Sequence, residues 1–528
     1  MDKKTLRFLS IFLLLLLPAL TLMFSNQLYF GYDVLTHIGR INEFHAAVLN
    51  GQIPPRLAPT IVHGNGYPLF VVNYQLPYYF TEFLMVIKND SVSAFKAVMS
   101  ITYLLSGVFA FLLFRKIGSN LASMTGAIVF SYLPYRFANL YSRGSIGESV
   151  SLMFVPLIFL FMHNIIEKRR FSIPLLALSI FGLITSHSVI FIIFVPVFVA
   201  YAVIILKIDK KTLLHLIIVS ILGFTLSSFQ LLPSIFERKF LFFDKTLLDI
   251  YSGQFVNIFQ IFRIPIQGVN VGTSFQAGII SLVVLAAAFG LFIYKRQLRV
   301  LLFLAFSLMA TYFITQYSKW FWDNITILPY IIYPWRFISI IIISVSFLSV
   351  YIIDFFKSKN LKIIIVLLLI FGSIYTSRHY YLKTEHSEPL LPRETLTAFD
   401  ESTPVWSSKK TFKDGPLILS TNNINVSGLE EKPFRISFGI MTENTSDITI
   451  RRMYFPGWTL EVNGEPYPLG NTDGFLSTKL KAGTWKVDVY FVETPLRRTA
   501  NAISLVSLII IIGLFVGELR NHKHRYNT

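Results

Sequence analysis

Long apolar blocks alternate with short polar or basic segments along most of the chain. Each block is long enough, or nearly so, to cross a hydrocarbon core about 30 Å thick as one helix. The pattern predicts about twelve spans, at residues 7–25, 95–114, 121–135, 150–166, 172–187, 189–206, 212–231, 276–294, 300–316, 337–356, 361–377 and 499–516. We therefore predict an all-α polytopic membrane protein whose transmembrane core occupies residues 1–377.

Basic residues cluster in the short segments between the apolar blocks, and they predict the orientation of the chain. Positively charged loops are retained in the cytoplasm. With twelve spans and both termini cytoplasmic, every cluster falls on the inner side, at residues 115–116, 168–170, 207–211, 295–299 and 357–362. The outer face then receives the longer segments, at residues 26–94, 133–149, 232–275, 316–336 and 378–498. We expect a multi-pass protein of the plasma membrane whose active face is extracytoplasmic.

Residues 67–87 form a further apolar block, which is long enough to span but contains Asn73, Gln75 and Glu82. Counting this block as a span would move the basic pair at 115–116 to the outer side. We therefore interpret it as an interfacial or re-entrant aromatic helix. On this interpretation residues 26–94 form one outer loop.

A different pattern begins after the eleventh span. The stretch "MYFPGWTLEVNGEPYPL" contains an alternating strand, an Asn463-Gly464 turn and a second strand, and "TWKVDVYFV" alternates apolar and polar positions. The pattern predicts a small extracytoplasmic β-rich domain, sandwich-like, at residues 378–498. Residues 499–528 would then form the last transmembrane helix and a basic cytoplasmic tail.

The composition narrows the possible functions. The chain is 54% hydrophobic and only 14% charged, with a formal net charge of +18. Because the basic residues flank apolar blocks and are not gathered on one soluble domain, the charge indicates membrane lipids as partners and no nucleic acid. The chain has no cysteine, which excludes disulfides, thiolate zinc sites and a cysteine nucleophile. It also lacks a Walker loop and a GxGxxG motif, so neither ATP nor a dinucleotide is implied.

The first candidate site follows the first apolar block, in "FGYDVLTHIGRINEF". Asp33, His37 and Arg40 are spaced by four and three residues, so a helix would align them in one stripe with Glu43 nearby. A carboxylate in this position could accept a proton from a hydroxyl nucleophile or hold a divalent cation such as Mg²⁺ or Mn²⁺. The alternative is a solvated amphipathic helix whose charged residues only face water.

The second candidate site lies in "LPYRFANLYSRGSIGES". Arg136, Arg143 and Glu148 occur there, and Arg336 stands in "YPWRF" at the start of the tenth block. Guanidinium groups beside aromatic rings at interface depth suit a phosphate carried on a lipid. The alternative is that these arginines anchor helices among ordinary lipid headgroups. His187, in "TSHS", is expected to be a packed turn histidine.

Four stretches together resemble a known group of proteins. They are "GYDVLTHIGRINEFHAAVLNGQIPPRLAPTIVHGNGYPLFVVNYQLPYYF", "LPYRFANLYSRGSIGESVSLMFVPL", "PWRF" and "MYFPGWTLEVNG". The chain resembles bacterial integral membrane proteins named as 6-pyruvoyl-tetrahydropterin synthase-related and the neighbouring YfhO-like proteins, which look like members of the GT-C superfamily of glycosyltransferases. The pterin-synthase part of the name finds no support in the sequence, because a histidine-ligated zinc needs a histidine cluster that the chain lacks.

The resemblance implies an activity and assigns roles. GT-C enzymes carry an acidic residue in the first outer loop, and Asp33 occupies the matching position. Many have two acids side by side, whereas here Val34 follows Asp33 and the next acid is Glu43, which favours a single catalytic base over a metal-dependent mechanism. The expected catalytic residues are Asp33, His37 and Arg40, with no metal ligand assigned. The expected substrate-binding residues are Arg136, Arg143, Glu148, Arg336 and Glu43.

The expected function is transfer of a sugar from a polyprenyl-phosphate-linked donor to an extracytoplasmic glycan or protein acceptor in the cell envelope, with inversion. No cofactor is required by this reading, although a divalent cation is compatible with it. Two alternatives come from other classes: a translocase or transporter of lipid-linked glycans, and a non-catalytic envelope assembly factor. A transporter should carry ionisable groups near the midplane of its spans. The spans here are nearly free of charge, which favours chemistry at the outer face.

Overall fold

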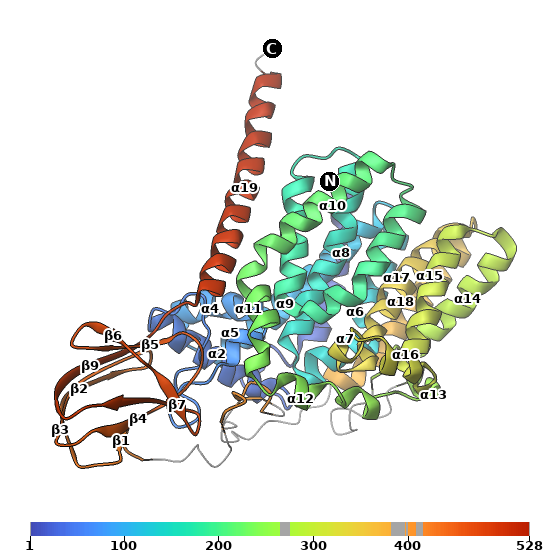
Figure 1. Cartoon of the computed structure of the whole chain (residues 1–528). Coiled ribbons are helices and arrows are strands. Elements are labelled where there is room, and N and C mark those ends of the chain that lie inside the picture. The colour runs from blue at the N-terminus through green and yellow to red at the C-terminus, as the bar shows by residue number, and fades with distance from the viewer. Residues whose placement is uncertain (1, 265–274, 382–395, 398–399, 408–414, 527–528) are drawn as a thin grey trace.

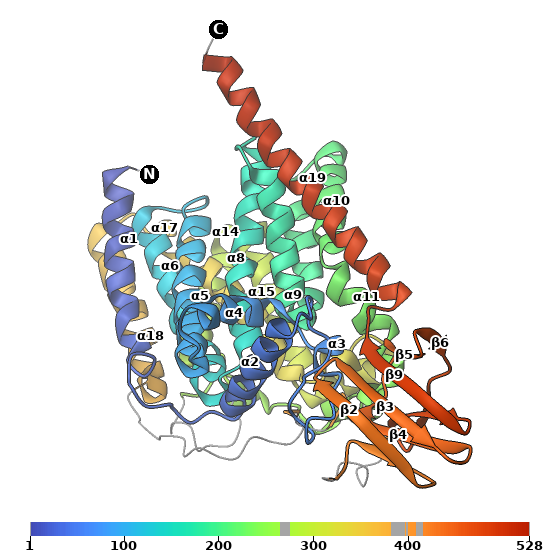
Figure 2. The ribbon, with the colours of Figure 1, turned by 90° about the vertical axis from the view of Figure 1, so that its left-hand side faces the viewer.

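A bundle of helices and a β domain make up the molecule (Figure 1). A computed structural model describes residues 2–264, 275–381, 396–397, 400–407 and 415–526. Both termini lie at one end of the helical bundle, and the β domain lies at the opposite end (Figures 1 and 2). This arrangement confirms the predicted fold class, a helical core with a β-rich region near the C-terminus.

Six helical segments within the described residues are long and apolar enough to cross a membrane. They are Ser91–Phe114 (α5), Ile146–Ile166 (α8), Ser172–Ile205 (α9 and the turn after it), Pro334–Phe355 (ending in α17, Ile338–Phe355), Lys359–Tyr381 (α18) and Pro495–Arg520 (within α19, Pro495–Tyr526). Two bent pairs could add a span each: α10 (Lys210–Leu226) with α11 (Ser228–Phe236), bent by 71°, and α15 (Leu298–Ile314) with Gln316–Asn324, bent by 85°. Shorter apolar helices are α1 (Lys3–Leu16), α6 (Asn120–Tyr132) and α14 (Ile279–Lys295). The count of twelve spans therefore stays a prediction.

Helix α9 (Ser172–Ala200) is interrupted at His187, whose φ of −165° and ψ of 92° are not helical. His187 lies 3.9 Å from Glu148 in the first turn of α8, whereas Tyr201, just beyond α9, hydrogen-bonds to His163 in the last turn of α8 at 2.6 Å. The chain therefore reverses at His187, so that residues 172–186 and 188–205 form two antiparallel legs beside α8. The reversal places His187 at the end of the bundle where α8 begins.

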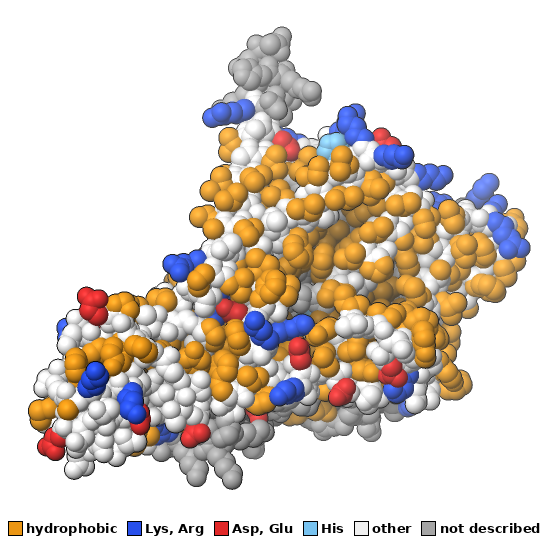
Figure 3. Space-filling view, in the orientation of Figure 1, with side chains coloured by type: hydrophobic (Ala, Val, Ile, Leu, Met, Phe, Trp, Pro, Cys, Tyr) orange, Lys and Arg blue, Asp and Glu red, His pale blue; other side chains and the backbone are white. Residues whose placement is uncertain are grey.

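The surface is consistent with a membrane protein. On the face drawn in Figure 3, hydrophobic side chains cover the helical bundle, and Lys and Arg side chains gather at the end where the termini lie. The opposite end, toward the β domain, carries acidic and basic side chains together (Figure 3). Basic loops favour the cytoplasm, and the orientation of the chain in the membrane stays a prediction.

The segment after α1 folds into short helices at the end of the bundle that faces the β domain: α2 (Val34–Leu49), α3 (Leu69–Val72) and α4 (Leu76–Lys88). Helix α4 buries Tyr78 while Phe83, Val86 and Ile87 are about 70% exposed. One buried face and one exposed apolar face over 13 residues suit a helix lying in the membrane interface. Other short helices near this end are α7 (Pro134–Phe137), the π-helical turn η2 (Ala138–Arg143), α12 (Phe243–Leu247), α13 (Ile258–Ile261) and α16 (Lys319–Asn324).

Within the described residues, nine strands form two antiparallel sheets in the β domain. One sheet has the order β1-β4-β8-β7 and the other β2-β3-β9-β5-β6. The strands are β1 (Ile418–Ser420), β2 (Ile424–Lys432), β3 (Arg435–Thr442), β4 (Ser446–Met453), β5 (Trp458–Val462), β6 (Glu465–Tyr467), β7 (Gly470–Thr472), β8 (Phe475–Leu480) and β9 (Gly483–Phe491). Buried side chains of both sheets, such as Ile450 and Val489, share one core, as in a sandwich. The predicted stretch at 382–395 lies outside the described residues, as does 265–274 of a predicted outer loop.

The β domain is held against the bundle by a buried arginine. The Arg56 side chain is fully buried, and it donates to Glu493 Oε1 at 3.0 Å, to the Phe229 carbonyl at 2.8 Å and to Asn501 Oδ1 at 3.2 Å. These partners belong to the link after β9, to α11 and to α19. Because one side chain joins three elements, the segment between α2 and α3 fixes the sandwich in place.

Candidate active site

A cavity of about 230 Å³ lies where the start of α2, the turn η2, α11 and the loop before α17 meet. It brings together side chains from both candidate sites, Asp33, His37 and Arg40 from the first and Arg143 and Arg336 from the second. Its other polar and aromatic lining residues include Thr36, Asn73, Tyr74, Ser145, His187, Ser188, Gln230, Ser234, Tyr330, Tyr333 and Glu401. The cavity thus combines carboxylates, guanidinium groups and aromatic rings.

Asp33 stands immediately before α2 and lines the cavity with a side chain that is 40% exposed. Its Oδ2 atom is 3.4 Å from Nη2 of Arg143. The pairing is fixed by the backbone, because the N–H groups of Tyr32 and Asp33 donate to the carbonyls of Ser142 and Arg143 at 3.1 and 2.7 Å. A long ion pair and partial exposure leave this carboxylate accessible to a substrate hydroxyl.

His37 and Arg40 occupy the next turns of α2 and are both buried. The Nδ1 atom of His37 is 2.9 Å from the Tyr78 hydroxyl. Arg40 donates to the Leu396 carbonyl at 2.8 Å and to Asn73 Oδ1 at 3.1 Å. Burial holds the pKa of His37 well below its ordinary value of 6.5, and the charges of Arg40 and Arg143 lower it further. His37 is therefore neutral at neutral pH and can orient neighbouring groups without adding charge.

Glu148 is the buried centre of the arginine cluster. Its Oε1 accepts hydrogen bonds from Arg143 Nη1 at 2.8 Å and from Arg336 Nε at 2.9 Å, and its Oε2 accepts one from the Tyr135 hydroxyl at 2.8 Å. One carboxylate therefore holds two guanidinium groups at the cavity wall, and the trio keeps a net positive charge. Such buried charges must be paired to be tolerated.

Aromatic rings also lie beside the guanidinium groups of Arg143 and Arg336. The Arg143 guanidinium lies 4.7 Å from the centre of the Trp335 ring, and Arg336 lies 4.8 Å from that of Tyr333. Burial alone would lower the pKa of Arg143, but Glu148 and Asp33 raise it above its ordinary value. Arg143 is therefore a permanent cation, suited to bind an anion through directional N–H groups.

Arg136 and Glu43 point elsewhere, although the sequence groups them with the site. The Arg136 side chain is buried between the rings of Phe130 and Tyr103 and donates to Ser106 Oγ at 2.5 Å. Burial lowers its pKa to about 10. Glu43 accepts hydrogen bonds from the backbone N–H of Thr60, at 2.9 Å, and from the hydroxyl group of Thr60. It therefore anchors the loop that follows α2. Neither residue lines the cavity, and a substrate contact is not supported for either.

His187, Tyr333 and Glu401 line the cavity but were not among the expected site residues. His187 is present because α9 reverses there, and its ring lies 5.7 Å from that of Tyr74. The sequence signal for His187 was its position between two apolar blocks. A polar residue at the reversal between two spans lies at the end of the bundle. Glu401 follows a long stretch without strong pattern, and no sequence signal identified it.

The part of the chain that the structure describes contains no group of three or more His, Cys, Asp or Glu side chains placed to hold a metal ion. A divalent cation, Mg²⁺ or Mn²⁺, therefore stays a prediction of the sequence. No step proposed below depends on such an ion.

Comparison with known proteins gives a family and more distant similarities. Residues 72–380 match a family of membrane proteins described as "6-pyruvoyl-tetrahydropterin synthase related domain". An uncharacterized protein of Lactococcus lactis subsp. cremoris is 28% identical over 250 residues, which cover 45% of this chain and 41% of that protein. The chain thus matches less than half of this relative's length.

Two solved structures are similar at low identity. One is the arabinofuranosyltransferase AftD from Mycobacteria, with a TM-score of 0.45, 13% identity and coverage of 72% of this chain and 27% of AftD. The other is the Archaeoglobus fulgidus oligosaccharyltransferase, with a TM-score of 0.43, 13% identity and coverage of 72% and 54%.

Proposed function

Because the chain belongs to the membrane-protein family described as 6-pyruvoyl-tetrahydropterin synthase related, we propose that its polar cavity catalyses glycosyl transfer at the extracytoplasmic membrane surface. The donor would be a sugar on polyprenyl phosphate, and the acceptor a hydroxyl of an envelope glycan or protein. One observation carries the proposal: a half-exposed carboxylate, Asp33, and the guanidinium of Arg143 face the same cavity only 3.4 Å apart. An inverting transfer needs both groups at the reacting centre.

Asp33 acts as the general base in this proposal. The acceptor oxygen attacks the anomeric carbon, its proton passes to the Asp33 carboxylate, and the bond between that carbon and the phosphate oxygen breaks. Attack from the side opposite the leaving group inverts the configuration, as in inverting sugar chemistry that uses a carboxylate base. The leaving group is polyprenyl phosphate, which gains the negative charge of the broken bond.

Arg143 and Arg336 stabilise that charge. A guanidinium offers five N–H donors in a planar fork, and Glu148 occupies one donor atom of each arginine. Groups that are already oriented toward a developing charge lower the barrier without reorganising during the reaction. Glu148 is a positioning residue here, because it touches the arginines and not the reacting atoms.

His37 and Arg40 support the acceptor side. Arg40 holds Asn73 at the cavity wall, and His37 packs beside Tyr74 with its ring centre 6.4 Å away. These contacts favour positioning roles for both residues next to the base. The proximity of the β domain to this end of the bundle (Figure 2) supports a role for that domain in holding the acceptor.

Breaking of the donor bond distinguishes this function from translocation of a lipid-linked glycan. The purified protein in nanodiscs would be incubated with the lipid extract and the envelope glycans of the cells that carry it, and free polyprenyl phosphate would be measured by mass spectrometry. Glycosyl transfer predicts that polyprenyl phosphate rises and that one glycan gains a sugar. Unchanged lipid and glycan would refute the proposal, because translocation has no consequence in a nanodisc.

A further inference from the structure

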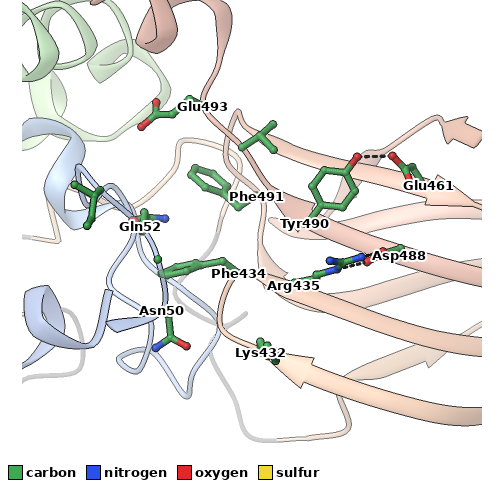
Figure 4. A pocket seen from close by; sticks show the side chains of 13 residues that line it. Asn50, Gln52, Lys432, Phe434, Arg435, Glu461, Asp488, Tyr490, Phe491 and Glu493 are labelled. Atoms are coloured by element: carbon green, nitrogen blue, oxygen red, sulfur yellow. Dashed lines mark hydrogen bonds and ion pairs between the residues drawn. The ribbon is translucent and has the colours of Figure 1, made fainter. Parts of the chain in front are cut away.

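A second and larger pocket lies away from the candidate active site. Its volume is about 580 Å³, and its two walls are the segment after α2, residues 50–53, and the five-stranded sheet (Figure 4). No step of the proposed reaction uses this pocket. Its lining places aromatic rings beside charged groups.

The sheet wall follows from the register of three neighbouring strands. Val487 and Val489 of β9 are buried in the domain core, so Asp488 and Tyr490 point to the opposite face. In the neighbouring strand β3, Arg435 pairs with Tyr490. On the other side of β9, Glu461 of β5 pairs with Asp488. The strand register therefore places polar and aromatic side chains on the face of the sheet that lines the pocket.

Hydrogen bonds hold these side chains in fixed positions. Arg435 donates from two nitrogens to the two oxygens of Asp488, one of them at 3.1 Å, and the Tyr490 hydroxyl donates to Glu461 (Figure 4). A Tyr490 ring that is tethered at its hydroxyl offers a flat apolar surface with ordered polar groups beside it. This combination suits a sugar, whose ring has apolar C–H faces and an edge of hydroxyl groups.

The opposite wall is held in a fixed conformation. Gln52 is held through its Oε1, which accepts from the backbone N–H groups of Arg56 and Leu57 at 2.5 and 2.8 Å. Gln52 and Glu493 both line the pocket, and Glu493 is held by Arg56 at 3.0 Å. The wall around Gln52 is therefore formed before any ligand binds.

The charges of the pocket argue against an anionic ligand. Lys432 and Arg435 are its cations, whereas Glu461, Asp488 and Glu493 are its anions. Arg435 is already paired with Asp488, and Glu493 is paired with Arg56. These pairs leave Lys432 and Glu461, whose charges balance, so the pocket has no excess positive charge to attract phosphate or an acidic sugar. The Glu461 carboxylate can accept a hydrogen bond from a neutral hydroxyl group.

Helix α2 links the pocket to the active-site cavity. It begins after Asp33, at the cavity, and ends before Asn50, at the pocket. A helix of 16 residues is about 24 Å long. A single sugar cannot reach both places, whereas an extended glycan of several sugar units can.

We propose that this pocket binds a neutral sugar segment of the glycan acceptor, several units away from the hydroxyl that reacts at Asp33. The identity of that glycan as the acceptor rests on the proposed function, but binding itself needs no catalysis. The pocket would thereby select acceptors by the sugars distant from the reacting end.

Binding is tested with full-length protein in nanodiscs and two labelled probes. These are the neutral and the acidic oligosaccharides released from the envelope of the same cells by mild acid. Fluorescence polarisation should detect binding of the neutral fraction to wild-type protein, at least tenfold weaker binding to Tyr490→Ala, and retained binding to Tyr490→Phe, which keeps the ring. Lys486→Ala, on the same face of β9 but outside the pocket lining, is the matched control and should bind like wild type.

Asp33→Asn separates this inference from the proposed function. If the pocket binds glycan, Asp33→Asn keeps full binding even though it loses transfer, and a failed transfer reaction would then count only against the proposed function. Equal binding by wild type and Tyr490→Ala, binding of the acidic fraction alone, or no binding of either fraction to wild type would each overturn the inference.

Discussion

The carboxylate of Asp33 lies 3.4 Å from the guanidinium of Arg143, although the two residues belong to different segments of the chain. The backbone fixes this relationship, since Asp33 N–H donates to the carbonyl of Arg143 at 2.7 Å. The proposed base for the acceptor and the proposed cation for the leaving phosphate are therefore held in register before any substrate arrives. Such pre-organisation is what an inverting transfer requires.

Removing the Arg143 side chain should weaken use of the donor. Arg143→Ala deletes a charged hydrogen-bond donor from the cavity, and such bonds contribute about 1.5–3 kcal/mol. We expect the KM for the lipid donor, measured with equal amounts of folded protein, to rise by about ten- to a hundredfold. The matched comparison is Arg136→Met, which removes a guanidinium that lies outside the cavity and should leave that KM nearly unaltered. Equal changes in the two variants would contradict the assignment.

Glu148→Gln should destabilise the protein as well as reduce its activity. The variant leaves the Arg336 guanidinium buried without a carboxylate and Arg143 with only the more distant Asp33, and breaking such a buried pair costs about 3–5 kcal/mol of unfolding free energy. The apparent melting temperature in a fixed detergent would report the loss. Adding Arg336→Met to Glu148→Gln should recover part of it, because fewer charges are left unpaired. If the double variant lost as much melting temperature as the two single variants together, the contact would not couple these residues.

The sequence located several parts of the cavity because their relationship is local. Asp33 immediately precedes α2, and His37 and Arg40 lie on its following turns, so helical spacing alone aligned them. Arg336 was found through its place at the start of an apolar block. The alternation around Asn463-Gly464 likewise gave the strands of the sandwich, because each strand buries every second residue.

The parts that the sequence missed depend on how distant elements meet. A continuous α-helix would have placed Arg136 and Arg143 on one face, about two turns apart. The π-helical turn from Ala138 to Arg143 adds residues to each turn, so the two side chains diverge. His187 reaches the cavity only through the reversal of α9, and no periodicity within one segment could predict its neighbours.

Protonation of His37 should make the protein less stable in mild acid. The pKa of His37 is depressed in the folded protein, mainly by burial, so below its ordinary value of 6.5 the unfolded chain binds a proton that the folded chain does not. Stability from this group is fully present above pH 6.5 and falls as the pH decreases, by at most about 1.4 kcal/mol per unit. Melting temperatures between pH 7.5 and 5 should therefore fall more steeply for wild type than for His37→Gln. Parallel curves would contradict a buried neutral His37.

The absence of native cysteines permits a direct test of the orientation. Single cysteines at Lys88, after α4, and at Glu430, in β2, should react with a membrane-impermeant maleimide in intact cells. A cysteine at Lys211, at the start of α10, should react only after the cells are opened. Labelling of Lys88→Cys and Glu430→Cys from opposite sides of the membrane would contradict the predicted orientation.

The substitution Asp33→Asn tests the central claim most directly. It keeps the size of the side chain and removes the base, and Glu430→Gln, an exposed change in the β domain, is the control. Lipid extracts and envelope glycans would be quantified by mass spectrometry in cells that express each variant at equal level. Catalysis by Asp33 predicts that Asp33→Asn cells accumulate the polyprenyl-phosphate-linked sugar and lack one sugar on a glycan, whereas control cells match wild type. Wild-type levels of both molecules in Asp33→Asn cells would contradict the claim.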